Sequence, residues 1–220
     1  MQLEIRKNVF APSAFTELFA KNMVINSGES IIDIGTGSGA LAILAAKLGG
    51  KVFATDKYKE PIECAKSNAK RNKVNINFKL GKFFAGTKKK FDVVIPNLPQ
   101  EVMEKSFRKK IGAKIADSSD GGKDGNQVST YILKNAKKHM HKNSRLYMSI
   151  GSMCDFQPLL KKALQNYEIK LLDYTRMAIK EFEIENIEKY KKLSDVGKLR
   201  IFKRNNKWFR EDYFYELKLK

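Results

Sequence analysis

Apolar residues in this chain recur with two spacings, one typical of buried strands and one typical of amphipathic helices. Short apolar or alternating runs predict strands at residues 31–34, 52–55, 76–80, 91–95, 146–150, 169–172 and 213–217. Residues at helical spacing predict helices at 12–26, 40–48, 61–69, 101–117, 128–136, 155–164 and 178–192. Because strands and helices alternate, the pattern predicts a doubly wound α/β fold whose parallel strands are joined by right-handed crossovers.

A glycine-rich segment, S-I-I-D-I-G-T-G-S-G-A at Ser30–Ala40, joins the first predicted strand to a helix. Gly35, Gly37 and Gly39 let the backbone turn sharply, and they let a ligand approach main-chain N–H groups without meeting a Cβ atom. Such a turn at this place in an α/β fold indicates a nucleotide-type cofactor. A glycine-rich turn without a ligand is the simpler alternative.

Two acids decide which cofactor fits this loop. Gly35, Gly37 and Ala40 also satisfy the dinucleotide pattern G-x-G-x-x-A, and Asp56 ends the next predicted strand. Asp33, however, stands at the mouth of the loop, where a pyrophosphate would meet like charge. S-adenosylmethionine (SAM) has no phosphate and carries an ammonium and a sulfonium, so Asp33 favours SAM. Asp56 is then expected to accept hydrogen bonds from the ribose hydroxyls.

The arrangement D-x-G-x-G-x-G from Asp33 to Gly39, followed by an acid closing the second strand, resembles the cofactor-binding half of class I SAM-dependent methyltransferases. The resemblance implies a Rossmann-like, mostly parallel seven-stranded sheet with an antiparallel last strand. Lys82 stands where many members carry an acid near the adenine amino group, and Phe83 would pack against the purine. The implied cofactor site comprises Asp33, Gly35, Thr36, Gly37, Gly39, Asp56, Lys57, Lys82, Phe83 and Asn97.

The turn after the fourth predicted strand reads P-N-L-P-Q at Pro96–Gln100. Its two prolines cannot continue a strand or a helix, so we expect a rigid turn beside the cofactor. The turn resembles the N-P-P-Y motif of methyltransferases that act on planar nitrogens. This implies that Asn97, Leu98 and Pro99 form the catalytic turn, with the Asn97 side-chain oxygen and the Leu98 carbonyl accepting hydrogen bonds from the target amine. Leu98 and Gln100 depart from the motif, and an ordinary turn is the simpler alternative.

Two further segments resemble one subfamily of these methyltransferases. P-S-A-F-T-E at residues 12–17 has the spacing of the P-R-P-E-T-E segment in HemK/PrmC-type glutamine methyltransferases, and D-G-G-K-D-G at residues 120–125 resembles their G-G-x-D-G segment. The resemblance implies methyl transfer to a protein glutamine, of the release-factor or ribosomal-protein type. The helical N-terminal substrate domain of bacterial PrmC is absent from this sequence. We therefore expect recognition by inserts or by a small partner protein.

The sequence is also compatible with other functions. Variants reading N-L-P occur in some tRNA guanine methyltransferases, so an RNA or DNA base could be the acceptor held by Asn97. A SAM-binding interaction protein without catalysis would explain the departures at Lys82, Leu98 and Gln100. An NAD(P)-dependent oxidoreductase is disfavoured by Asp33.

The formal net charge of +19 suggests either a nucleic-acid surface or solvated lysines produced by a compositional bias. Arg200–Arg210 carries Phe202, Trp208 and Phe209 among basic residues, so it would contact RNA or form an edge hairpin with solvated charge. The basic stretch 101–117 predicts an amphipathic lid or a solvated helix.

Length and composition indicate one domain, because 220 residues with 42% hydrophobic content suffice for one α/β core. We expect a single domain over residues 1–220, with an N-terminal helical segment (1–28), a cofactor-binding core (29–175) and a C-terminal helix and final strand (176–220). Two cysteines and two histidines, without metal-ligand spacing, indicate neither a disulfide framework nor a metal site. We expect a cytoplasmic protein, because the sequence shows no signal peptide and no apolar run of the ~20 residues that a membrane span needs.

Overall fold

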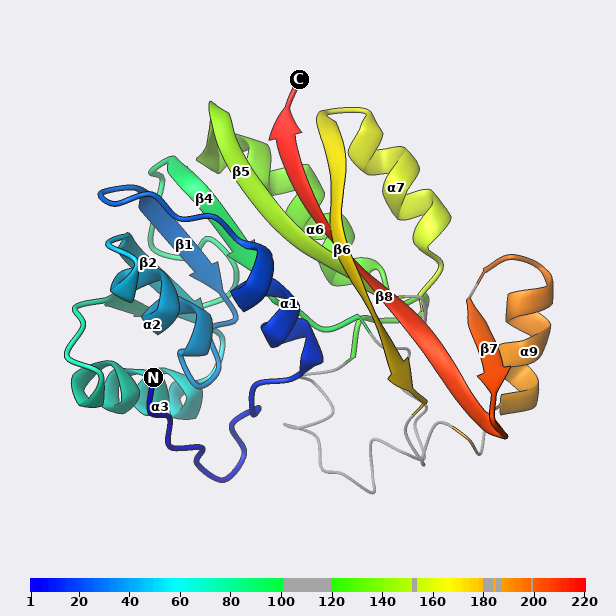
Figure 1. The fold of residues 1–220 in the computed structure, drawn as a ribbon. Helices are drawn as coiled ribbons and strands as arrows, with labels where there is room; N and C mark the ends of the chain where they lie inside the picture. Colours follow the sequence, from blue (N-terminus) through cyan, green and yellow to red (C-terminus); the bar gives the residue numbers. More distant parts are fainter. Residues whose placement is uncertain (101–119, 152–153, 180–183, 185–186, 199) are drawn as a thin grey trace.

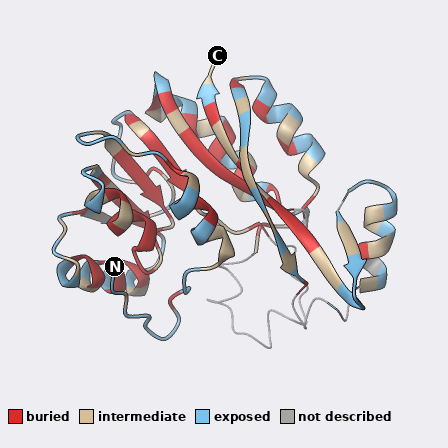
Figure 2. Ribbon diagram, in the orientation of Figure 1, coloured by how far each residue is buried: buried red, intermediate tan, exposed pale blue. Residues whose placement is uncertain are grey.

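The computed structural model describes residues 1–100, 120–151, 154–179, 184, 187–198 and 200–220. One twisted sheet crosses the middle of the molecule, and helices pack on both of its faces (Figure 1). The central strands are the most deeply buried part of the chain (Figure 2).

Within the described residues, the sheet has eight strands, seven of which follow the order β3-β2-β1-β4-β5-β8-β6, while β7 pairs with β8. Neighbouring strands from β3 to β5 are parallel, and β8 runs antiparallel to β5, β6 and β7. The strand bounds are Ser30–Ile34 (β1), Lys51–Asp56 (β2), Asn77–Leu80 (β3), Phe91–Pro96 (β4), Met140–Gly151 (β5), Tyr167–Ala178 (β6), Ile201–Arg204 (β7) and Lys207–Leu219 (β8).

Helices cover the two faces of the sheet in two groups. Apolar residues of α1 and α2 pack with one set of alternating strand residues, and those of α6, the 3₁₀ helix η1 and α7 pack with the other set. The helix bounds are Ala14–Asn22 (α1), Ala40–Lys47 (α2), Lys59–Arg71 (α3), Gln127–Asn135 (α6), Ala136–His139 (η1), Phe156–Leu164 (α7) and Ile187–Asp195 (α9). Both faces of the central strands are therefore buried. This explains why Ile31, Ile32 and Ile34 are all apolar, with Asp33 the exception in this strand.

The predicted fold class is confirmed: the sheet is mostly parallel, and the last strand inserts antiparallel between β5 and β6. The short strand β7 is an addition that the sequence pattern indicated only as an edge hairpin. Asn205 and Asn206 form the turn of that hairpin with φ of 47° and 61°, a backbone conformation that asparagine tolerates better than most residues.

One predicted helix begins at the wrong place. The spacing predicted a helix from Ala178, but Ala178 ends β6, where it pairs with Phe209, and α9 begins at Ile187. Pairing with β8 along its whole length outweighs the helical spacing of the sequence that follows. The predicted lid at residues 101–117 lies outside the described residues. In the part of the chain that is described, no helix is long and apolar enough to cross a membrane.

Candidate active site

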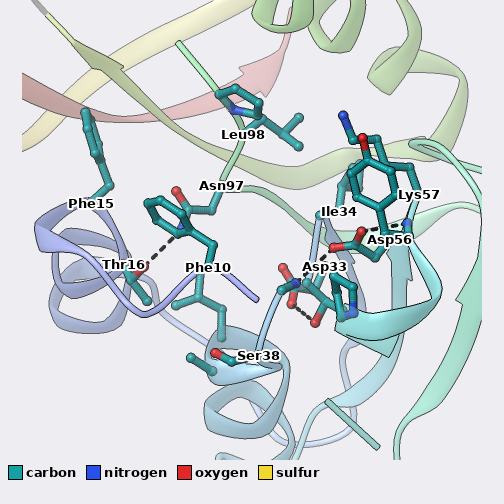
Figure 3. Close-up of a pocket in the computed structure, with 18 of the residues that line it drawn as sticks. Phe10, Phe15, Thr16, Asp33, Ile34, Ser38, Asp56, Lys57, Asn97 and Leu98 are labelled. Carbon is teal, nitrogen blue, oxygen red and sulfur yellow. Dashed lines mark hydrogen bonds between the residues drawn. The ribbon is translucent and has the colours of Figure 1, made fainter. Parts of the chain in front are cut away.

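A pocket of about 360 Å³ lies where the carboxyl ends of β1, β2 and β4 meet the start of α1 (Figure 3). Carboxyl ends of parallel strands are where open α/β sheets bind ligands. The pocket brings together nearly all the residues that the sequence predicted: Asp33, Gly35, Thr36, Gly37, Asp56, Lys57, Lys82, Phe83, Asn97, Leu98 and Pro99. It also has lining residues that the predicted site did not include, among them Phe10, Ser13, Phe15, Thr16, Tyr58, Gln100, Asp120 and Val128.

The glycine-rich loop uses its own N–H groups to bind the neighbouring strand. The Gly35 and Thr36 N–H groups donate to the Thr55 carbonyl, at 2.8 and 2.9 Å. The Gly37 N–H donates to Oδ2 of Asp56 at 3.1 Å. A pyrophosphate needs such main-chain donors, and here they already have acceptors. The loop therefore fits a ligand that makes few phosphate-type contacts, which agrees with SAM and disfavours a dinucleotide.

Glycine is favoured at positions 35 and 39 of the loop for different structural reasons. At Gly35, the φ of +73° favours glycine, and a Cβ atom would lie 2.8 Å from Cδ2 of Leu98, so the Leu98 side chain would have to move. Gly39 does not line the pocket. A Cβ atom there would lie 3.0 Å from Cβ of Ala65, so Gly39 allows α2 to pack closely against α3.

Asp33 is a buried carboxylate at the end of β1, only 1% exposed. Thr36 donates its hydroxyl to Oδ2 of Asp33 at 2.7 Å. Burial raises the pKa of Asp33 to about 7, and the nearby charge of Asp56 also acts to raise it. A cationic ligand group placed beside Asp33 would reverse this effect, because it favours the ionised carboxylate. The ammonium of SAM fits this requirement.

Asp56 ends β2 and accepts two main-chain hydrogen bonds, from Gly37 at 3.1 Å and from Tyr58 at 3.0 Å. Burial raises its pKa as well. The Lys57 ammonium lies 4.7 Å from the centre of the Tyr58 ring. A carboxylate held in this way at the pocket wall can accept hydrogen bonds from ligand hydroxyls.

Lys82 and Phe83 reach the pocket from the turn after β3. Phe83 has φ of +55°, its carbonyl accepts a hydrogen bond from the Thr55 hydroxyl at 2.7 Å, and its ring stacks on Tyr131 at 4.2 Å between centroids. The ring of Phe83 thus packs against α6 as well as lining the pocket.

Asn97 follows directly after β4, and its orientation depends on α1. Its amide nitrogen donates to Oγ1 of Thr16 at 3.1 Å, and the same oxygen accepts the Ser13 N–H at 3.1 Å. Figure 3 shows the Asn97 side chain beside Thr16, with the hydrogen bond between them drawn as a dashed line, so this bond fixes the orientation of the amide. The amide therefore presents an oriented acceptor at the end of β4.

Gln100 takes the place of an aromatic residue and holds the turn to β5. Its Nε2 donates to the Ser149 carbonyl at 2.7 Å and its Oε1 accepts the Gly151 N–H at 2.9 Å. A Cβ atom on Gly121 would lie 2.8 Å from Cα of Gln100, and one on Gly125 would lie 2.6 Å from the Gln100 carbonyl oxygen. The D-G-G-K-D-G segment is therefore a close-packed support beneath the Asn97 turn.

The described residues contain no cluster of three or more histidine, cysteine or acidic side chains that could hold a metal ion. His139 instead stacks its ring on Phe84 at 4.2 Å between centroids, and Cys64 and Cys154 are free and buried.

The sequence of the chain matches a family model described as ribosomal protein L11 methyltransferase (PrmA) over residues 15–125. It is 31% identical to a putative protein N5-glutamine methyltransferase of Methanocaldococcus jannaschii, over 74% of this chain and 82% of that protein. It is 31% identical to the ribosomal protein L11 methyltransferase of Dictyoglomus thermophilum over 68% of this chain, but this match spans only 41% of that longer protein.

Among solved structures, a methyltransferase from Pyrococcus furiosus superposes with a TM-score of 0.58 over 96% of this chain and 87% of that chain, at 19% identity. The ribosomal protein L11 methylase of Lactobacillus delbrueckii gives a TM-score of 0.56 over 96% of this chain and 81% of that one, also at 19% identity. These two structures support the fold.

The fold and the pocket define a class I SAM-dependent methyltransferase. Within that class, the chain belongs to the group of protein methyltransferases that includes the PrmA family and the N5-glutamine methyltransferases.

Proposed function

We propose that this protein methylates the side-chain amide nitrogen of a glutamine in a protein substrate. The observation that carries the proposal is the oriented amide of Asn97, which Thr16 holds at the end of β4 in the pocket that also contains Asp33 and Asp56. The named functions of the relatives support a protein acceptor, since they include release factor glutamine methyltransferase from Streptococcus pneumoniae at 27% identity.

Asp33 and Asp56 fit SAM, the cofactor of this class of enzymes. Asp33 would hold the ammonium of SAM, and Asp56 would accept its ribose hydroxyls, because each carboxylate is fixed by its own hydrogen bonds and lines the pocket. When bound, SAM supplies an electrophilic methyl group on a positively charged sulfur. The other lining residues would help to exclude water from a cofactor bound in this pocket.

A glutamine amide nitrogen is a poor nucleophile because its lone pair is delocalised into the carbonyl group. Two acceptors that bind both N–H bonds hold the nitrogen in the attack geometry and stabilise the positive charge that develops on it. We assign one of these roles to Asn97 Oδ1 and the other to the Leu98 carbonyl. Pro99 and Gln100 restrict the turn, Pro99 through its ring and Gln100 through its bonds to β5.

Asn97→Ala tests this assignment. We expect methyl transfer to fall by ~10²-fold or more, because a preorganised polar contact made mainly in the transition state is lost. Affinity for S-adenosylhomocysteine should stay near that of the wild type, since we assign the Asn97 side chain chiefly to the methyl acceptor. Asn135→Ala, on α6 outside the pocket lining, is the matched control and should retain the wild-type rate.

The acceptor itself is identified with methyl-labelled SAM and a ribosome-containing cell extract. Separate portions are treated with protease and with ribonuclease, and labelled peptides are sequenced by mass spectrometry. Label released by protease and located on glutamine supports the proposal. Label released by ribonuclease would show that the Asn97 site acts on a nucleic-acid base. Label on a different peptide side chain would also contradict the glutamine assignment.

We also propose that recognition of the acceptor beyond the pocket is shared with a small partner protein. The Gln100 side chain is bonded to β5, so at this position the turn presents no aromatic ring against the acceptor, which supports a second recognition element. Purification of the tagged chain under native conditions, with label transfer as the readout of each fraction, tests this idea. Full activity of the isolated chain toward the intact substrate would contradict it.

A further inference from the structure

Strands β6 and β8 extend well beyond the end of β5. Pairing of β5 with β8 stops at Gly151, opposite Asp212, whereas β8 continues through residues 207–211 paired with β6 and β7. At ~3.3 Å per residue, this three-stranded ribbon projects roughly 15 Å past β5. It leaves the same edge of the sheet at which the cofactor pocket opens, because β6 runs parallel to β5 (Figure 1).

The two faces of the ribbon differ in what covers them. Trp208 and Ile201 lie on the face covered by α9: the Lys191 ammonium lies 5.4 Å from the Trp208 ring, and Ile201 packs with Tyr190. Because side chains alternate along a strand, the neighbours of Trp208 and Ile201 point to the opposite face. We call this opposite side the aromatic-basic face; its aromatic and basic residues are Tyr174, Arg176, Arg200, Phe202, Arg204, Lys207, Phe209 and Tyr213, and Ala178 and Glu211 also lie on it.

Aromatic rings and cations alternate on this face. The Phe202 and Phe209 rings stack at 5.8 Å, and Tyr174 lies beside Tyr213 at 6.4 Å between centroids. The Arg176 guanidinium lies 5.5 Å from the centre of the Tyr174 ring and 5.6 Å from that of Phe202. A groove of about 390 Å³ runs here, lined by Arg176, Phe202, Arg204, Asn205, Lys207 and Phe209.

Among the described residues, Glu211 is an acid that two of these cations contact, and they neutralise it. The side chain of Glu211 is 10% exposed, and it pairs with Arg176 at 3.0 Å and with Arg200 at 3.6 Å. The Tyr213 hydroxyl donates to Glu211, and this bond is the largest cause that lowers the pKa of the carboxyl group. The cations remain accessible, since the side chains of Arg176 and Arg200 are 50% and 62% exposed, and Tyr174 is 49% exposed.

We propose that the aromatic-basic face binds single-stranded nucleic acid. Cations spaced along the ribbon match the phosphate backbone, and half-exposed rings between them give bases a surface on which to stack. An acidic protein segment would need the cations but would gain little from the rings, so the pattern favours nucleic acid. The net charge of +19 adds long-range attraction for the same ligand.

Nucleic-acid binding on the ribbon is related to methyl transfer by the position of the ribbon. On its other face, the Arg210 guanidinium lies 5.8 Å from the ring of Phe15, which lines the cofactor pocket. A strand bound on the aromatic-basic face would thus lie across the ribbon from the pocket and leave the pocket open. The enzyme would then bind a protein acceptor that is presented on RNA.

Fluorescence anisotropy with the full chain and a labelled oligouridylate of roughly 12 nucleotides tests the proposal, with an oligothymidylate as the DNA arm. We expect salt-sensitive binding. Arg204→Gln should weaken it several-fold and reduce the log–log salt slope by about 0.7, the value for one phosphate contact on a single strand. Tyr174→Leu should weaken binding by about tenfold at every salt concentration, because it removes a stacking ring.

The matched control is Lys203→Gln. Lys203 is adjacent to Arg204, loses the same charge on substitution and pairs with Trp208 on the α9 side, so binding should stay near wild type. Thermal unfolding of each variant reports on folding separately. Equal losses for Lys203→Gln and Arg204→Gln would overturn the proposal, as would absence of binding at low salt. Displacement by polyglutamate together with an unchanged affinity of Tyr174→Leu would identify the face as a docking site for acidic protein instead. None of these measurements depends on the glutamine assignment.

Discussion

Thr16 shows how a single hydroxyl from a distant element can control the acceptor site. Its oxygen is shared between the Ser13 N–H, which begins α1, and the Asn97 amide, 81 positions along the chain. We expect Thr16→Val to lower kcat by roughly fivefold, the equivalent of one ordinary hydrogen bond of about 1 kcal/mol, because the Asn97 amide then loses its orientation. Thr16→Ser keeps the hydroxyl and should restore most of the rate.

Steady-state kinetics on both variants, with calorimetry for S-adenosylhomocysteine, separates orientation from a general packing defect. If Thr16 acts through Asn97, then Thr16→Val adds almost nothing in an Asn97→Ala background. A further loss in the double variant would show that Thr16 contributes by another route.

The sequence predicted the residues whose chemistry is local. Asp33 and Asp56 were predicted because they flank the glycine-rich loop near the ends of the first two strands, and Asn97 because the turn after the fourth strand resembles the N-P-P-Y motif. The roles of Thr16 and Gln100 in orienting the turn depend on contacts between segments far apart in the chain. No local pattern carries that information.

At the scale of elements, two glycine turns with the same backbone conformation should respond differently to substitution. Gly125 has φ of +74°, and an added Cβ would lie 2.6 Å from the Gln100 carbonyl oxygen and 2.7 Å from Cβ of Cys154. Gly28 has φ of +86° and no neighbour within 4 Å of the added atom. Gly28→Ala therefore measures backbone strain alone, at about 1 kcal/mol.

We expect Gly125→Ala to cost roughly 2–4 kcal/mol, because overpacking is added to the strain, and to lower activity by displacing the Asn97 turn. Urea unfolding of both variants supplies the comparison. Equal free energies of unfolding would mean that the D-G-G-K-D-G segment yields to the added atom and does not support the turn.

Element boundaries were predicted less well than element types. The final strand was expected over 213–217 and extends from Lys207 to Leu219, and the strand expected over 169–172 extends from Tyr167 to Ala178. Both strands continue because they pair with each other past the core. There the ribbon carries charged and aromatic residues, and it lacks the alternation of apolar and polar residues from which a strand is predicted. Pairing partners, which the sequence pattern does not specify, set these lengths.

For the whole molecule, the predicted order of strands and helices was sufficient to predict the fold class, because right-handed crossovers leave few ways to arrange a βαβ chain. The charge distribution could not be derived in the same way. The sequence left a nucleic-acid surface and solvated lysines as equal alternatives for 200–210, and only the register of β6, β7 and β8 places rings and cations on one face.

The stability of the whole molecule should depend on pH through Asp33. The pKa of this carboxyl group is about 7 in the folded protein and near its ordinary value of 3.8 when unfolded, so between these values the folded state binds more protons. The free energy of unfolding then decreases as pH rises from about 4 to 7, and this contribution levels off above 7. Asp33→Asn keeps the acceptor for the Thr36 hydroxyl but cannot ionise, so its stability should show a smaller decrease over the same range.

The same proton is linked to the cofactor. An ammonium placed beside Asp33 stabilises the carboxylate, so binding of S-adenosylhomocysteine below pH 7 should release a proton, and affinity should rise with pH until about 7. Calorimetry in two buffers of different ionisation enthalpy measures the proton release directly, and thermal unfolding with and without ligand measures the stability. In Asp33→Asn both the proton release and the pH dependence of affinity should be largely lost, together with part of the affinity itself. Proton release that is unchanged in Asp33→Asn would assign the linkage to another group, with Asp56 the next candidate because its pKa is raised in the same pocket.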